Sequence, residues 1–187
     1  LALFRVVPWD SVPATPYITF VDFVPMNYQS FSQWSRPHLM PLTYMRSLRM
    51  SKDLGPSFSL DELKPNTKPV ADESKKPNAL IDGWLIDKIV RYQNPLGCWG
   101  GYTTSTVFSL LAMVHFSEHS TRQQNKIKNA KSLGLNILRT LYLNPENGAY
   151  TGITCDGTNC DTMLSVTALL ETGFQASELK ESLEFVT

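Results

Sequence analysis

Apolar residues recur at helical spacing through the second half of the chain. After Asn78, a residue type that caps helix N-termini, the apolar positions are Leu80, Ile81, Trp84, Leu85 and Ile89. This pattern predicts one helix from Asn78 to the Asn94-Pro95 turn. The same spacing predicts helices over residues 104–116, 121–143 and 161–171, and a last helix from Ser177. Because residues 104–116 are almost all apolar, we expect that helix to be buried on most sides.

Proline punctuates the first half of the chain. Residues 1–30 combine Pro with aromatic residues, and repeated Pro prevents a long helix, so we predict an extended, packed arm. Residues 30–50 should form a helix that Pro37 and Pro41 kink or split. The predicted organisation is a Pro/aromatic arm and kinked helix over 1–50, a polar surface linker over 51–77, and α–α repeats over 78–187 that are incomplete at the C-terminus.

An internal repeat organises the helical half. Gly-Cys-Trp-Gly-Gly at 97–101 matches Gly-Ala-Tyr-Thr-Gly at 148–152, and small polar residues of the following helix also correspond. Each unit is a surface helix, a Gly–aromatic turn and a buried helix. Units of about 50 residues built from helix pairs stack into solenoids or closed toroids. We therefore predict an all-α fold of the α/α-toroid type, a partial α–α barrel of helical hairpins. Two unrelated helical hairpins are the alternative.

Charge and cysteine content narrow the partners. The 17 basic residues equal the 17 acidic ones, so a neutral chain offers no electrostatic attraction to nucleic acid. Three cysteines are too few, and odd in number, for a disulfide framework, which fits a reducing compartment. No apolar run approaches the roughly 20 residues of a membrane span. We expect a cytoplasmic protein, with peripheral contact at a membrane left open.

The first turn of the repeat has the form Q-x-x-x-G-x-W, with Gln93, Gly97 and Trp99 at the three fixed positions. The Gln side chain can hydrogen-bond backbone groups that a helix end leaves without partners. Glycine permits a positive φ. The indole supplies a large flat face on which the amide can stack. We therefore expect a rigid clasp between an outer and an inner helix.

Q-x-x-x-G-x-W is the QW motif of the terpene cyclase/mutase family, and four further segments resemble squalene–hopene and sporulenol-type cyclases. Residues 7–13 resemble P-W-E-x-V-P, residues 31–42 resemble S-[WYF]-A-R-x-x-x-x-P, residues 100–108 resemble the entry to the inner helix, and residues 159–165 resemble V-W-D-T-x-L-x. Their order and spacing match the family over almost the whole chain.

This resemblance implies part of a triterpene cyclase, which folds and cyclises a linear, squalene-like polyprene through a protonation-initiated carbocation cascade. In the family, a buried and protonated Asp of a D-x-D-D motif supplies the proton. No D-x-D-D occurs in these 187 residues, and in the family it comes later in the sequence. Since the sequence starts without Met and ends within a predicted helix, we expect a piece of a longer enzyme. Without the missing C-terminal half, this piece should be inactive.

The resemblance also implies that the chain supplies cavity wall. The substrate-binding residues it indicates are Trp34, Tyr102, Thr104 and Cys160. Cys160 and Tyr150 stand where the family usually has Trp, so the Cys should reshape or enlarge the cavity. The linker replaces a longer stretch that includes a membrane-dipping helix in squalene–hopene cyclases, which puts membrane attachment by this segment in doubt. No cofactor is implied.

Two other functions remain open on the sequence. One is a non-catalytic α/α-toroid module that binds lipid or acts as a scaffold. The other is a protein-prenyltransferase-like subunit, which needs zinc ligands. His115 and His119 fit H-x-x-E-H but end a helix, and Cys155 with Cys160 has poor spacing for zinc, so we predict no metal site. Asp161 is expected to cap a helix rather than act as an acid, and His38 is isolated in the sequence and is expected to be an ordinary polar residue.

Overall fold

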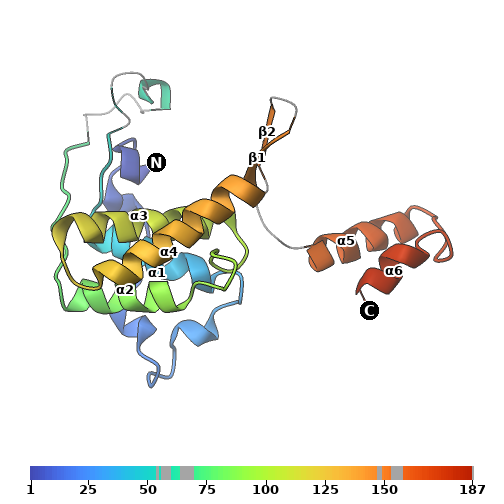
Figure 1. The fold of residues 1–187 in the computed structure, drawn as a ribbon, viewed down its shortest axis with the longest axis horizontal. Helices are drawn as coiled ribbons and strands as arrows, with labels where there is room; N and C mark the ends of the chain where they lie inside the picture. Colours follow the sequence, from blue (N-terminus) through green and yellow to red (C-terminus); the bar gives the residue numbers. More distant parts are fainter. Residues whose placement is uncertain (54, 56–59, 64–69, 147–148, 153–157, 187) are drawn as a thin grey trace.

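Short helices dominate the computed structural model, which describes residues 1–53, 55, 60–63, 70–146, 149–152 and 158–186. The longer helices are α1 (Arg36–Ser47), α2 (Ile81–Arg91), α3 (Thr103–His119), α4 (Gln124–Ile137), α5 (Thr158–Glu171) and α6 (Lys180–Val186). A two-stranded antiparallel hairpin, β1 (Leu143–Glu146) and β2 (Ala149–Gly152), separates α4 from α5. The fold is all-α apart from this hairpin (Figure 1).

The N-terminal arm is a series of 3₁₀ turns, at Ala2–Phe4, Trp9–Ser11, Tyr17–Phe20 and Tyr28–Ser30. It packs closely, because Phe20 is fully buried and the Trp9 indole donates to the Met50 carbonyl at 2.8 Å. The helix expected after the arm starts later than the sequence suggested. α1 begins at Arg36, which puts Pro37 in the first turn, where its missing N–H costs nothing. Pro41 lies inside α1 without splitting it.

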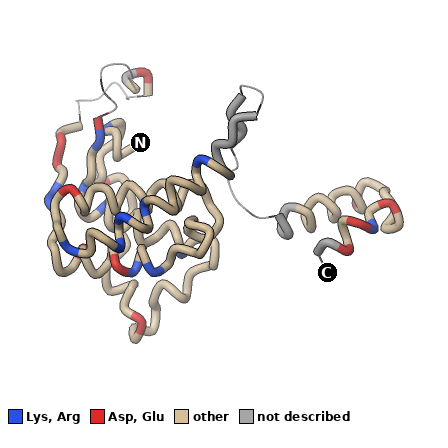
Figure 2. Tube along the Cα trace, in the orientation of Figure 1, with Lys and Arg blue, Asp and Glu red and all other residues tan. Residues whose placement is uncertain are grey.

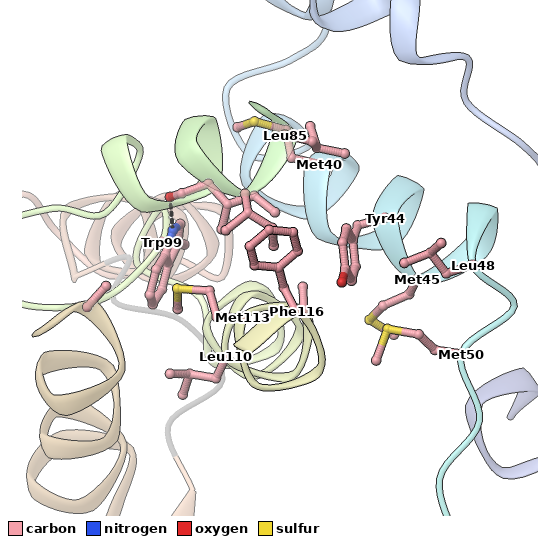
Figure 3. Packing of buried hydrophobic residues seen from close by; sticks show 14 of the residues in the cluster. Met40, Tyr44, Met45, Leu48, Met50, Leu85, Trp99, Leu110, Met113 and Phe116 are labelled. Carbon is pink, nitrogen blue, oxygen red and sulfur yellow. Dashed lines mark hydrogen bonds between the residues drawn. The ribbon is translucent and has the colours of Figure 1, made fainter. Parts of the chain in front are cut away.

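Helix α3 is the centre of the packed bundle and contacts α1, α2 and α4. Ser105, Ser109 and Ala112 are fully buried on it, and their small side chains allow neighbouring helices to approach closely. Met113 and Phe116 fill the space toward α2 and α1, beside Tyr44 and Leu85 (Figure 3). The predicted burial of the apolar helix is therefore confirmed.

The chain departs from the predicted helix over 121–143. Helix α4 ends at Ile137, a π-helical turn spans Leu138–Tyr142, and the strands of the hairpin follow. The second copy of the Gly–aromatic turn falls partly in β2 and partly outside the described residues. Beyond the hairpin, α5 and α6 pack against each other, and Figure 1 shows them set apart from the α1–α4 bundle. Large apolar side chains are exposed here, among them Met163 and Leu164 of α5 and Phe174 between the two helices.

A buried polar contact fixes the arm on α2. The Tyr17 hydroxyl donates to Oδ1 of Asp82 at 2.5 Å and lies 2.8 Å from the Ser47 hydroxyl of α1. Burial, and then the bond to Asp82, raise the pKa of Tyr17 well above its ordinary value. The other Asp82 oxygen accepts from the Asn78 N–H at 2.6 Å. One carboxylate therefore joins the arm to the start of α2.

Surface charges of both signs are interspersed rather than segregated (Figure 2). Asp87 on α2, for example, pairs with Arg91 on the same helix at 2.6 Å and with Lys126 on α4 at 3.2 Å. These pairs are exposed on the basic side, and such pairs contribute little to stability. The bundle depends instead on its apolar core.

Acid should destabilise this bundle through His115, which is 7 % exposed and lies 3.1 Å from the Tyr44 hydroxyl through Nδ1. Burial, and then the neighbouring His119, lower the pKa of His115 below its ordinary value. The folded state therefore binds the proton less tightly than the unfolded state. Stability should be complete at neutral pH and fall as the pH drops below about 6.5.

Urea titrations from pH 7.5 to pH 5 test this expectation. His115→Gln should flatten the acid side of the profile of unfolding free energy against pH. His119→Gln is the control and should retain most of the slope, because burial is the larger cause of the shift. Equal slopes in the wild type and in His115→Gln would show that another group controls the acid side.

Candidate functional site

The turn between α2 and α3 is built around the indole of Trp99. This side chain is 1 % exposed, and its Nε1–H donates to the Ile89 carbonyl of α2 at 2.7 Å (Figure 3). The Trp99 backbone is held from the other side, because Ser105 Oγ donates to its carbonyl and Thr106 Oγ1 accepts from its N–H. The indole therefore ties the last turn of α2 to the first turn of α3.

Gln93 extends the same contact to α4. Its Nε2 donates to the Gly97 carbonyl at 2.8 Å and to the Ala130 carbonyl at 2.9 Å. The first bond closes the turn, and the second reaches across to a helix 37 residues further along the chain. Both acceptors are backbone groups, as the sequence suggested, although Ala130 lies within α4 rather than at a helix end.

The backbone conformation at position 97 and the lack of space beside it both require a glycine. Its φ is +103°, and a Cβ at this position would lie 2.6 Å from the Leu133 carbonyl oxygen of α4. Gly134 of α4 is equally close to the turn, because a Cβ there would lie 3.1 Å from Cζ3 of Trp99. The backbone of α4 at Gly134 thus packs directly against the Trp99 ring of the turn. We call Gln93, Gly97 and Trp99, with these bonds, the clasp.

Asn94 also belongs to the turn, although the sequence analysis gave it no role beyond ending α2. Its Oδ1 accepts from the N–H groups of Gly97 and Cys98, each at 3.0 Å. An Asn side chain that binds backbone N–H groups further along the chain is a recurrent turn device, and Asn-Pro is its sequence signal.

Three of the four predicted cavity-wall residues gather at one edge of the bundle. Thr104 lies in the first turn of α3, and its hydroxyl is 2.8 Å from Nε2 of His38. The His38 ring lies 5.3 Å from the Tyr102 ring, and its Nδ1 lies 3.0 Å from the Trp34 carbonyl. The Trp34 indole itself is 63 % exposed. Cys160 lies in α5, and its side chain is outside the described residues.

The structure corrects the expectation that His38 is an isolated, ordinary polar residue. Its ring contacts the Trp34 carbonyl, the Tyr102 ring and the Thr104 hydroxyl. Its partner Thr104 is 66 residues away in sequence, so no local pattern could have shown the contact.

Two cavities lie away from these residues. One of about 570 Å³ lies between the arm and α2 and includes Tyr28, Trp84 and Lys88. Another of about 300 Å³ lies beside His115 and His119. Neither includes a predicted wall residue.

No group of three or more His, Cys, Asp or Glu side chains occurs among the described residues in a position to hold a metal ion. His119 Nδ1 lies 2.9 Å from the His115 carbonyl, and His115 faces Tyr44, so both imidazoles have protein partners. Over the same described ranges, no helix is long and apolar enough to cross a membrane.

Comparisons with known proteins found two matches. Residues 1–88 match the profile of the squalene-hopene cyclase N-terminal domain. The chain is also 29 % identical over 186 residues to the squalene-tetrahymanol cyclase of Tetrahymena thermophila, a match that covers 92 % of this chain and 28 % of the relative. The chain thus spans a little over a quarter of that protein's length. No solved structure matched.

Helical hairpins joined by a Gln–Gly–Trp turn define an α/α-toroid protein. With the two matches, this architecture is similar to that of the terpene cyclase family, and residues 1–88 carry the similarity to the N-terminal domain of the squalene-hopene cyclases.

Removing the Trp99 indole should strongly destabilise the bundle. Trp99→Ala is expected to lower the free energy of unfolding by about 3–5 kcal/mol, because it leaves a large cavity between α2, α3 and α4. Trp34→Ala is the matched control, and the exposure of that indole predicts a loss within about 0.5 kcal/mol. Chemical unfolding measures both. A loss below about 1 kcal/mol for Trp99→Ala would mean that Trp99 holds nothing together.

The amide group of Gln93 should contribute to the stability of the bundle independently of the size of the side chain. Gln93→Leu keeps the size of the side chain but leaves the carbonyls of Gly97 and Ala130 without this donor. We expect a loss of about 1–3 kcal/mol in unfolding free energy. Gln93→Glu should be similarly weakened, since a carboxylate cannot donate to either carbonyl. Wild-type stability in both variants would contradict the bonding described.

Proposed function

We propose that this chain forms part of a triterpene cyclase that folds and cyclises a linear, squalene-like polyprene by a protonation-initiated carbocation cascade. The observation that carries the proposal is the match to a squalene-tetrahymanol cyclase over 92 % of the chain, together with the clasp on which the fold is built. In this proposal the chain supplies part of the cavity wall, and the acid comes from elsewhere in the cyclase.

The chemistry of such a reaction suits the residues at the wall edge. A cation is stabilised over an aromatic face by the ring quadrupole, and Trp34 and Tyr102 offer such faces. The cavity must exclude water, because water would capture a cation before the rings close. Substrate-binding roles for Trp34, Tyr102, Thr104 and Cys160 are part of the proposal. For Cys160, a small side chain in place of the family's Trp would widen the cavity.

The acid is absent from the sequence as given, which holds no D-x-D-D motif. The proposed partner of this chain is therefore the remainder of a cyclase, which would close the wall and carry the acid. Cys98 is buried and forms no disulfide within the described part of the chain. We further propose a cytoplasmic location, in peripheral contact with the membrane in which so apolar a substrate dissolves.

A segment exchange tests this function. Residues 1–187 replace the matching segment of the Tetrahymena cyclase, and cyclic product from squalene is measured. The chimaera should cyclise squalene. Trp34→Ala in the chimaera should lower the rate about tenfold, the loss expected for one cation–π contact.

Trp84→Ala is the control, because it removes a partly exposed indole on α2 that forms no part of the clasp or of the wall edge, and it should leave the rate unchanged. A chimaera that folds and binds squalene but forms no cyclic product would contradict the proposal. It would favour a lipid-binding module without catalysis.

A further inference from the structure

His38 lies where two parts of the proposed wall meet. It occupies the first turn of α1, and Thr104 occupies the first turn of α3. Nε2 of His38 is 2.8 Å from the Thr104 hydroxyl, and Nδ1 is 3.0 Å from the Trp34 carbonyl. The imidazole also lies 5.3 Å from the Tyr102 ring, at a tilt of 54°. One side chain thus contacts both segments that carry the predicted wall residues.

The contacts determine the tautomer of the imidazole. A carbonyl oxygen can only accept, so Nδ1 must carry the proton and donate to Trp34. A neutral imidazole then has no proton on Nε2, which must accept from the Thr104 hydroxyl. The Thr104 proton is therefore committed to His38, and only the lone pairs of its oxygen are free for other partners.

Backbone packing next to His38 fixes this geometry. Pro37 is buried against Gly100 of the turn, where a Cβ would lie 2.5 Å from Cγ of the proline. Gly100 has a φ of +65°, which few other residues adopt. Any side chain at Gly100 would thus push the start of α1 away from the turn. The approach of Pro37 to Gly100 brings His38 within reach of Thr104.

We infer that His38 is a positioning residue, which joins Trp34, Tyr102 and Thr104 into one fixed section of cavity wall. The inference rests on the proposed function for its substrate, a squalene-like polyprene, but its geometry can be tested separately. A hydrocarbon offers no polar group to orient these residues, so their placement must come from the protein itself. His38 supplies it from two hydrogen bonds and a ring contact.

The tautomer is the first test, and it needs no substrate. Nitrogen-15 NMR of the histidine-labelled chain at about pH 8 distinguishes the two nitrogens of the neutral ring. His38→Gln identifies the resonances by their loss. We expect the proton on Nδ1, and we expect Thr104→Val to shift the Nε2 resonance while Thr104→Ser does not. A proton on Nε2, or an Nε2 resonance unmoved in Thr104→Val, would overturn the inference.

Squalene binding by the chimaera with the Tetrahymena cyclase, measured in detergent micelles, is the second test. We expect His38→Ala and Thr104→Val each to weaken binding about three- to tenfold, as for one lost hydrogen bond. The double variant should be no weaker than either single variant, because the two changes remove one interaction. Thr104→Ser should bind like the unsubstituted chimaera, as should the control His119→Gln. Unfolding midpoints identify any variant whose loss comes from instability.

The outcomes separate the two proposals. If the chimaera binds squalene and the losses multiply in the double variant, or if Thr104→Val binds normally, His38 does not position the wall. If the chimaera binds no squalene, the proposed function fails for this chain. The tautomer measurement alone then tests the hydrogen bonds between His38, Trp34 and Thr104.

Discussion

The indole of Trp99 and its hydrogen bond to Ile89 determine how the helices of this chain pack. A buried N–H without an acceptor would cost more than the bond contributes, so the indole can sit between the helices only where a carbonyl faces it. That carbonyl comes from the last turns of α2. Gly134 of α4 then approaches the ring so closely that a Cβ there would lie 3.1 Å from Cζ3 of Trp99. One aromatic side chain thus sets the spacing of three helices.

The clasp and the wall edge are adjacent parts of one segment. Trp99 and Gln93 fix the turn on its buried side, whereas Gly100, Tyr102 and Thr104 present its other side to the start of α1. A firmly held turn lets the short contacts of Pro37 and His38 persist at a partly exposed edge. In a cyclase, where a hydrocarbon must be folded by shape, such rigidity has a direct use, because loosely held walls would accept several substrate conformations.

The sequence predicted much of this architecture because its strongest signals are local. Helical spacing located α2 and α3, and the seven residues from Gln93 through Gly97 to Trp99 contain most of the clasp. The features that the sequence did not predict depend on contacts between residues that are distant in the chain. His38 has an unremarkable sequence context, and its partner lies 66 residues away. The late start of α1 places Pro37 in the first turn, where the missing N–H of a proline costs least. The hairpin after α4 interrupts a pattern that remained helical by spacing alone.

Hydrogen exchange at the Trp99 indole nitrogen tests the central claim most directly. If the clasp holds α2, α3 and α4 together, this proton should exchange only when the bundle unfolds as a whole, and its rate should follow the global free energy of unfolding. The exposed Trp34 indole, in the same spectrum, should exchange within the dead time. A Trp99 proton that exchanges as fast as that of Trp34 would show that the turn opens locally, and that the indole does not hold these helices.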